Sequence, residues 1–180
     1  MLKLPLALEH ALLGFLRERP MHAYEMHQRL RRADVLGRVW RLKQSQLYAL
    51  LARLEEAGYI SGTLEEQEAR PARRVLHLTE AGQAAFDRWL LAPVEHGRDF
   101  RIEFLAKLFF AQRDGPAAVA TLLERQRAVC RRLLVELRDQ LDQQGTPVYE
   151  RLVVEFRIGQ VDAILRWLDI CAEELGVRPG

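Results

Sequence analysis

The sequence predicts a mainly α-helical protein that contains one small β-hairpin and divides into two domains. Three observations lead to this prediction. Leucines recur at helical spacing in most segments, residues 59–78 change to a strand-like composition, and the second half carries two long amphipathic segments. The 180 residues suffice for one or two domains, each with its own core. We place the boundary at a proline, so that residues 1–93 form one domain and residues 94–180 the other.

Helices are predicted for the start of the first domain. Apolar residues spaced three or four apart predict helices over 6–16, 23–33 and 44–57. The first ends before Pro20, because the residue that precedes a proline avoids the helical region. The third ends at Gly58, which can adopt the left-handed conformation that closes a helix.

A hairpin and one more helix complete this domain. We expect strands over 59–66 and 74–78, joined by a polar loop over 67–73 that contains a proline. Thr79 is a suitable N-cap for a helix over 80–91. The order of three helices, two strands and a helix is that of a winged helix-turn-helix.

The second domain is predicted to be entirely helical. Helices are expected over 100–112, 117–143 and 148–175. The two long helices carry more apolar surface than a single helical hairpin can bury. We therefore expect a helical dimerisation domain and a homodimer built mostly from residues after 100.

Basic residues are concentrated locally although the net charge is only +2. One cluster runs from the second predicted helix to the residue before the third, where only Asp34 opposes it, and a second lies at the hairpin. Their members are Arg29, Arg31, Arg32, Arg38, Arg41 and Lys43, and Arg70, Arg73 and Arg74. Both clusters fall where a winged helix meets phosphates. The alternative is that these arginines form solvated helix faces, and three glutamates in the same hairpin weaken any attraction to DNA.

Several classes of function lack support in the sequence. It contains no glycine-rich phosphate loop, no Gly-x-Ser-x-Gly and no His-Glu-x-x-His, so we expect neither an enzyme nor a cofactor. His22 and His27 are five residues apart, a spacing that does not place two metal ligands on one helix face. Two cysteines and the absence of any long apolar run predict a cytoplasmic protein without membrane contact.

Six motifs match the pattern of a known family. They are Ala11-Leu-Leu-Gly-Phe-Leu16, Pro20-Met-His-Ala-Tyr-Glu-Met26, Ser45-Gln-Leu-Tyr48, Leu51-Ala-Arg-Leu-Glu-Glu-Ala-Gly-Tyr-Ile60, Arg73-Arg-Val-Leu-His-Leu-Thr-Glu-Ala-Gly82 and Glu103-Phe-Leu-Ala-Lys-Leu-Phe-Phe110. In these the chain resembles PadR-type transcriptional regulators of the longer subgroup, which carries a helical C-terminal domain. The resemblance implies a homodimeric DNA-binding repressor, often released by a small molecule. One departure is that Lys43-Gln44 stands where the family usually has Ser-Pro, so the N-cap hydroxyl is lost.

The fold and the resemblance together select the residues expected to contact DNA. Amide and hydroxyl groups on the first turn of helix 44–57 can reach base edges, and the hairpin arginines can reach phosphates. Two tyrosines could use their hydroxyls in the same way or could pack in the core. The set is Tyr24, Lys43, Gln44, Ser45, Gln46, Tyr48, Arg53, Arg70, Arg73 and Arg74.

The sequence therefore predicts a sequence-specific DNA-binding transcriptional regulator, with double-stranded operator DNA and a second copy of itself as partners. We expect a repressor released by a small apolar or aromatic ligand between the two domains. Trp89 is the candidate contact for this effector, although packing alone could also explain it. The alternative function is a winged-helix module for protein contacts that does not bind DNA.

Overall fold

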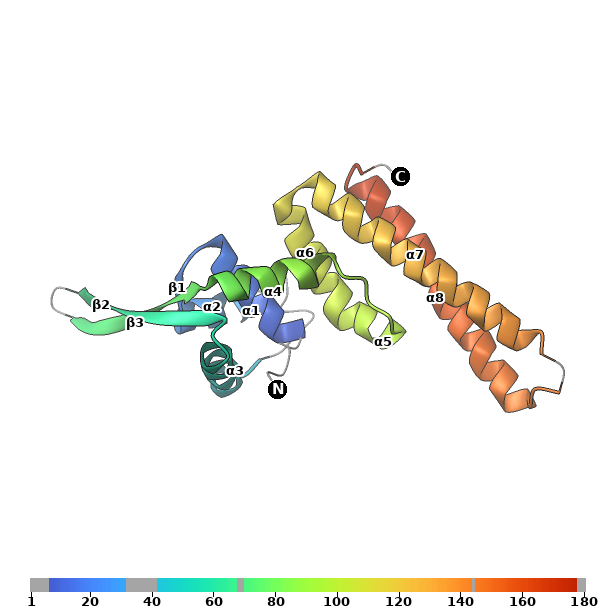
Figure 1. Cartoon of the computed structure of the whole chain (residues 1–180), viewed down its shortest axis with the longest axis horizontal. Helices are drawn as coiled ribbons and strands as arrows, with labels where there is room; N and C mark the ends of the chain where they lie inside the picture. Colours follow the sequence, from blue (N-terminus) through green and yellow to red (C-terminus); the bar gives the residue numbers. More distant parts are fainter. Residues whose placement is uncertain (1–6, 32–41, 68–69, 144, 178–180) are drawn as a thin grey trace. The chain divides into compact units, whose positions relative to one another are not determined.

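The computed structural model describes residues 7–31, 42–67, 70–143 and 145–177, with side chains for all of these except 66, 67 and 70–72. Figure 1 shows the elements in chain order. They form two compact units. One contains the described residues up to Leu90 together with Leu105–Phe110, and the other contains Leu91–Phe104 and the described residues from Ala111 onward. The boundary predicted at residue 93 does not account for residues 105–110, which belong to the first unit.

The first unit is the predicted winged helix-turn-helix. Its described elements are α1 (Ala7–Glu18), β1 (Met21–His22), α2 (Ala23–Arg31), α3 (Gln44–Glu56), β2 (Ile60–Gln67), β3 (Arg70–Leu78) and α4 (Glu80–Leu91). The described strands form an antiparallel sheet in the order β1-β3-β2. Met21 pairs with Leu76 on one side of β3, and Ile60 pairs with Leu78 on the other. The hairpin of β2 and β3 is hereafter called the wing.

The wing differs from the sequence prediction. The loop predicted over 67–73 is wrong, because β2 continues to Gln67 and β3 already begins at Arg70. Both strands continue as a two-stranded ribbon, whose polar residues gave this stretch a loop-like composition. The register shifts between Glu65 and Gln67, and strands tolerate a proline such as Pro71 near such irregularities. The prediction also missed β1, which is too short to show periodicity.

The core of the first unit surrounds α1. Leu12 and Leu13 are completely buried, and Phe15 and Phe86 both meet the ring of Phe110 edge-on. A Cβ on Gly14 would lie 2.6–2.7 Å from atoms of the Phe86 and Phe110 rings, so only glycine allows this approach. Phe110 comes from the returning segment of α6, which explains why that segment belongs to this unit.

Thr79 caps α4 as predicted. Its Oγ1 accepts a hydrogen bond from the Gly82 N–H at 3.1 Å and donates one to the Gly58 carbonyl at 2.7 Å. A Cβ on Gly82 would collide with the carbonyl oxygen of Tyr59. The start of α4 is therefore held directly against the corner between α3 and β2.

The second unit is helical, as predicted. Its described elements are α5 (Gly97–Asp99), a π-helical segment η2 (Phe100–Phe104), the end of α6 (Leu105–Asp114), α7 (Pro116–Leu141) and α8 (Val148–Glu174). The long helices α7 and α8 lie side by side (Figure 1). Their shared core contains Cys130, Leu134, Leu137, Val154 and Val161. No helix in the described ranges is both long and apolar enough to cross a membrane.

Two buried polar side chains of α7 hold this unit together. The Gln126 amide accepts a hydrogen bond from the Val94 N–H at 2.8 Å and donates one to the Val94 carbonyl at 2.9 Å. The neighbouring Arg127 donates to the Leu168 carbonyl and to the Asp169 carboxylate, each at 3.1 Å. The first residue fixes the segment before α5, and the second fixes the end of α8 against α7.

Replacing Gln126 should destabilise the second unit. The Gln126→Leu variant keeps most of the side-chain volume but leaves both backbone groups of buried Val94 unpaired. Each unsatisfied group costs about 1–3 kcal/mol, so for the two groups we expect the free energy of unfolding to fall by about 2–6 kcal/mol in urea titrations. Gln140→Leu, at an exposed position of the same helix, is the matched control. Equal unfolding midpoints for the two variants would contradict this assignment.

Candidate nucleic-acid interface

The start of α3 is built without a conventional N-cap. Lys43 occupies the N-cap position in an extended conformation, and it has no side-chain oxygen to accept a hydrogen bond. Instead, the Lys43 N–H donates to Oε1 of Gln46 at 3.0 Å. This is the glutamine half of a capping box. Gln46, predicted to read base edges, thus also holds the first turn of its own helix.

The two faces of α3 have different environments. Leu47, Leu51 and Leu54 are buried, as their spacing predicts. The first-turn residues Gln44, Ser45 and Gln46 are exposed, as is Lys43 before them. Gly58 ends the segment with a φ of 75°, so the left-handed closure predicted there is confirmed.

A groove lies between the start of α2, α3 and the wing. Its volume is about 710 Å³. The lining residues come from His22–Glu25, from Tyr48, Leu51, Ala52 and Glu55 of α3, and from Arg73, Arg74 and Leu76 of β3. Tyr24 and Tyr48 are 60% and 48% exposed, so their rings are presented to solvent rather than packed in the core. Four of the predicted DNA-contacting residues therefore border one groove: both tyrosines, Arg73 and Arg74.

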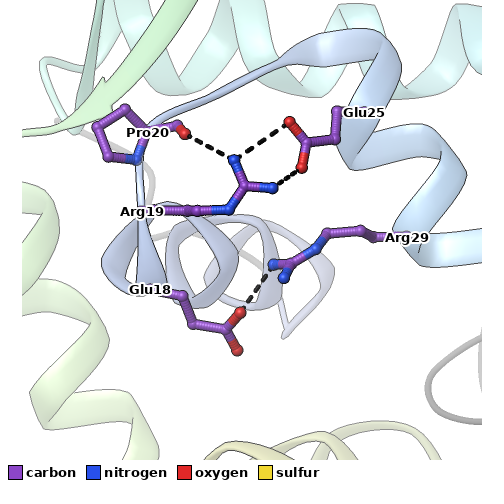
Figure 2. A network of polar contacts seen from close by, with 5 residues as sticks. All are labelled: Glu18, Arg19, Pro20, Glu25 and Arg29. Atoms are coloured by element: carbon purple, nitrogen blue, oxygen red, sulfur yellow. Dashed lines mark hydrogen bonds and ion pairs between the residues drawn. The ribbon is translucent and has the colours of Figure 1, made fainter.

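Arginines pair with acidic side chains at this groove and on the neighbouring helices. Arg19 pairs with Glu25 and also donates to the Pro20 carbonyl, as Figure 2 shows. In the same network Arg29 donates to Glu18 at 2.7 Å, which links α2 to the end of α1 (Figure 2). Arg29 belongs to the predicted basic cluster, yet it stabilises the domain internally.

The other predicted arginines divide into different roles. Arg53 bonds to Glu9 at 2.9 Å, although only 3% of the Glu9 side chain is exposed. Arg74 pairs with Glu55 of α3. Arg73 is exposed and stands opposite Glu65 in the wing. Outside the described part of the chain lie Arg32, Arg38, Arg41 and the side chain of Arg70.

Two family models match the chain. The PadR-like family of transcriptional regulators matches residues 12–88, and the C-terminal domain of virulence activator alpha matches residues 100–176. The chain contains a PadR-like family domain over residues 12–88. It is accordingly a transcriptional regulator rather than an enzyme, and it carries an additional C-terminal domain.

Known proteins resemble this PadR-family chain over different lengths. It is 28% identical over 187 residues to the probable transcriptional regulator Rv1176c of Mycobacterium tuberculosis, covering 94% of this chain and 98% of the relative. It is 27% identical over 103 residues to the negative transcriptional regulator PadR of Bacillus subtilis, covering 57% and 56% of the two chains. The crystal structure of Bacillus subtilis PadR in complex with operator DNA has 21% identity, coverage of 93% and 97%, and a TM-score of 0.47.

Trp89 of this PadR-family protein lies in a buried polar environment within the first unit. Its ring stacks on His10, with 5.1 Å between the ring centroids, and Lys107 Nζ lies 5.3 Å from the centroid of the indole ring. Trp89 is only 7% exposed. Its indole Nε1 is buried and finds no hydrogen-bond partner in the part of the chain that the structure describes. Packing therefore explains why the ring of Trp89 is buried, but it does not explain why its Nε1 is buried without a hydrogen-bond partner.

The cysteines and histidines do not form a reactive or metal-binding cluster within the described ranges. Burial raises the pKa of the Cys171 thiol to about 11, against a smaller opposing effect of Arg127, and burial also raises the pKa of Cys130. Such thiols are poorly reactive because little thiolate forms near neutral pH. His27 bonds to the Leu42 carbonyl at 3.3 Å. No group of three His, Cys, Asp or Glu residues in these ranges could hold a metal ion.

Sequence reasoning missed three residues that shape the interface. Glu9 and Glu55 were overlooked because their arginine partners are 44 and 19 positions away. Gly62 did leave a signal, because an isolated glycine inside a strand often marks the close approach of another group. In the structure that group is the side chain of Arg74.

The capping role of Gln46 can be separated from any contact with DNA. Gln46→Ala removes the acceptor for the Lys43 N–H, whereas Gln46→Glu keeps it. We expect the alanine variant to lose about 0.5–1 kcal/mol of unfolding free energy and the glutamate variant to lose none. Urea unfolding followed by circular dichroism measures both. Equal destabilisation by the two substitutions would show that this hydrogen bond does not support α3.

Proposed function

We propose that this PadR-family protein is a sequence-specific DNA-binding repressor whose groove beside α3 faces the duplex. The observation that carries the proposal is the groove itself, where exposed Tyr24 and Tyr48 lie beside Arg73 of the wing. In this arrangement the first turn of α3 enters the major groove, with Gln44, Ser45 and Gln46 toward base edges. Phosphates are bound by Lys43 and the wing arginines Arg70 and Arg73. Repression is supported by the similarity to the negative regulator PadR of Bacillus subtilis.

Selection from a random-sequence duplex library at near-physiological salt tests this proposal. We expect the full-length protein to enrich duplexes that contain an inverted repeat. It should bind them at least about 10³-fold more tightly than scrambled duplexes of the same composition. Failure to enrich any sequence would favour the alternative function, a winged-helix module that contacts proteins and not DNA.

An exposed apolar stripe on α8 supports a homodimer. Tyr149, Leu152 and Phe156 are 76%, 58% and 66% exposed, and their spacing places them on one face of the helix. A contiguous exposed patch of this kind is typical of an interface. A second copy is the partner we propose, because a two-fold dimer would present two α3 helices to the two halves of an inverted repeat.

Aspartates within this stripe should disrupt the dimer. The double variant Leu152→Asp/Phe156→Asp places two charges on the apolar face, and we expect it to be monomeric in light scattering at micromolar concentration. Arg151→Asp adds an aspartate in the same helical turn but away from the stripe, and should remain dimeric. A monomeric wild-type protein would contradict the proposed assembly.

The repressor would leave DNA when a small apolar or aromatic ligand binds beside Trp89. The unpartnered Nε1 of this residue supports the placement, because a ligand acceptor could satisfy a buried donor that otherwise destabilises the protein by about 1–3 kcal/mol. His10 and Lys107 border the same ring and would contact a ligand there.

Trp89 fluorescence tests the effector site. In a Trp40→Phe/Trp167→Phe background Trp89 is the remaining tryptophan. A phenolic or other aromatic compound that lowers affinity for the selected duplex should change its emission over the same concentration range. The matched variant Trp89→Phe should lose the response of DNA binding to that compound. A compound that releases DNA with unaltered Trp89 emission would place the effector site elsewhere.

A further inference from the structure

We infer that Glu55, Gly62 and Arg74 form a strut that positions the wing against α3 and keeps Arg74 away from DNA phosphates. The inference rests on the proposed DNA binding and assigns Arg74 a positioning role, in place of the phosphate contact that the sequence suggested. It predicts that Arg73 and Arg74, adjacent in the chain, act on DNA affinity in different ways.

Strand geometry separates the two arginines. Successive side chains of β3 point to opposite faces of the wing. Arg73 stands opposite Glu65 in the ladder, whereas Arg74 stands opposite Leu64. From that position the Arg74 guanidinium extends diagonally across β2 and pairs with Glu55 on α3.

Gly62 provides the path for this side chain. A Cβ at Gly62 would collide with Nε of Arg74 and would lie 2.9 Å from its Nη2 and 3.0 Å from its Cζ. The guanidinium therefore lies against the bare backbone of β2. A glycine inside a strand weakens the strand, and this close approach is a physical reason for its presence.

The ion pair has more effect on DNA binding than on stability. The side chains of Arg74 and Glu55 are 56% and 31% exposed, and an ion pair this exposed to solvent adds little to the stability of the fold. Each additional arginine on a phosphate, however, raises affinity for every sequence and steepens the salt dependence by about one unit. By holding Arg74, Glu55 lowers non-specific binding while fixing the wing where it fits the specific site. Specificity depends on the ratio of the two affinities.

The test compares two duplexes at several salt concentrations: one selected by the wild-type protein from a random library, and one scrambled. Arg73→Ala should weaken binding to both duplexes and make the salt slope shallower by about one unit. Arg74→Ala should weaken binding to the selected duplex about tenfold, which corresponds to about 1.4 kcal/mol. Its binding to the scrambled duplex and its salt slope should stay unchanged.

Glu55→Gln should release Arg74, strengthen binding to the scrambled duplex and steepen the salt dependence of that binding by about one unit. In Glu55→Gln/Arg74→Ala, that gain on the scrambled duplex should disappear.

Several results would overturn the inference. If Arg74→Ala reduces binding to both duplexes and the salt slope as Arg73→Ala does, Arg74 is a phosphate contact. If Glu55→Gln strengthens binding to the scrambled duplex by the same factor when Arg74 is replaced by alanine, the Glu55 carboxylate affects DNA binding only through its own charge and not by holding Arg74. Gly62→Ala, which displaces the guanidinium but keeps its charge, replaces Arg74→Ala if that variant does not fold. It should also reduce binding to the selected duplex, and unchanged binding would overturn the strut. A wild-type protein that enriches no duplex would instead refute DNA binding itself.

Discussion

The orientation of α3 depends on a carboxylate that is almost fully buried. Glu9 lies on α1, the helix around which the first unit is packed, and a charge in that position is tolerated only when it is paired. Arg53 of α3 supplies a partner at 2.9 Å. The pair therefore connects the helix that borders the groove to the centre of the core. The placement of Tyr48 and the first turn of α3 follows from this connection and from the buried leucines of the same helix.

Carboxylates divide the arginines of the winged domain into two groups. Arg19, Arg29, Arg53 and Arg74 each pair with a glutamate of the same unit. They organise the surface and add little net positive charge to it. Lys43 and Arg73, by contrast, are exposed, and under the proposed DNA binding they supply the positive charge that faces the duplex. This division reconciles a DNA-binding fold with a net charge of only +2, because short-range pairing determines which cations remain available.

The long helices of the second unit use different faces for different tasks. One face of α8 packs on α7 through Val154 and Val161, while Arg127 ties α7 to the end of α8. Another face carries Tyr149, Leu152 and Phe156 in solvent. A helical pair that is already closed by its own core can present such a stripe to a partner without losing its fold. Buried Gln126 fixes the segment before α5 by forming hydrogen bonds with both backbone groups of Val94.

The sequence by itself determined the order of helices, the winged helix-turn-helix, the family and the first-turn residues of α3. These features follow from local periodicity and short motifs, which repeat within a few residues. It could not determine the extent of the wing, because the polar stretch after Leu64 shows no alternation of apolar residues that would indicate a strand. Nor could it assign partners to Arg53 and Arg74, or show that Gln46 caps its own helix. Only the tertiary structure decided these points, because the fold determines which distant carboxylate comes within reach of each arginine.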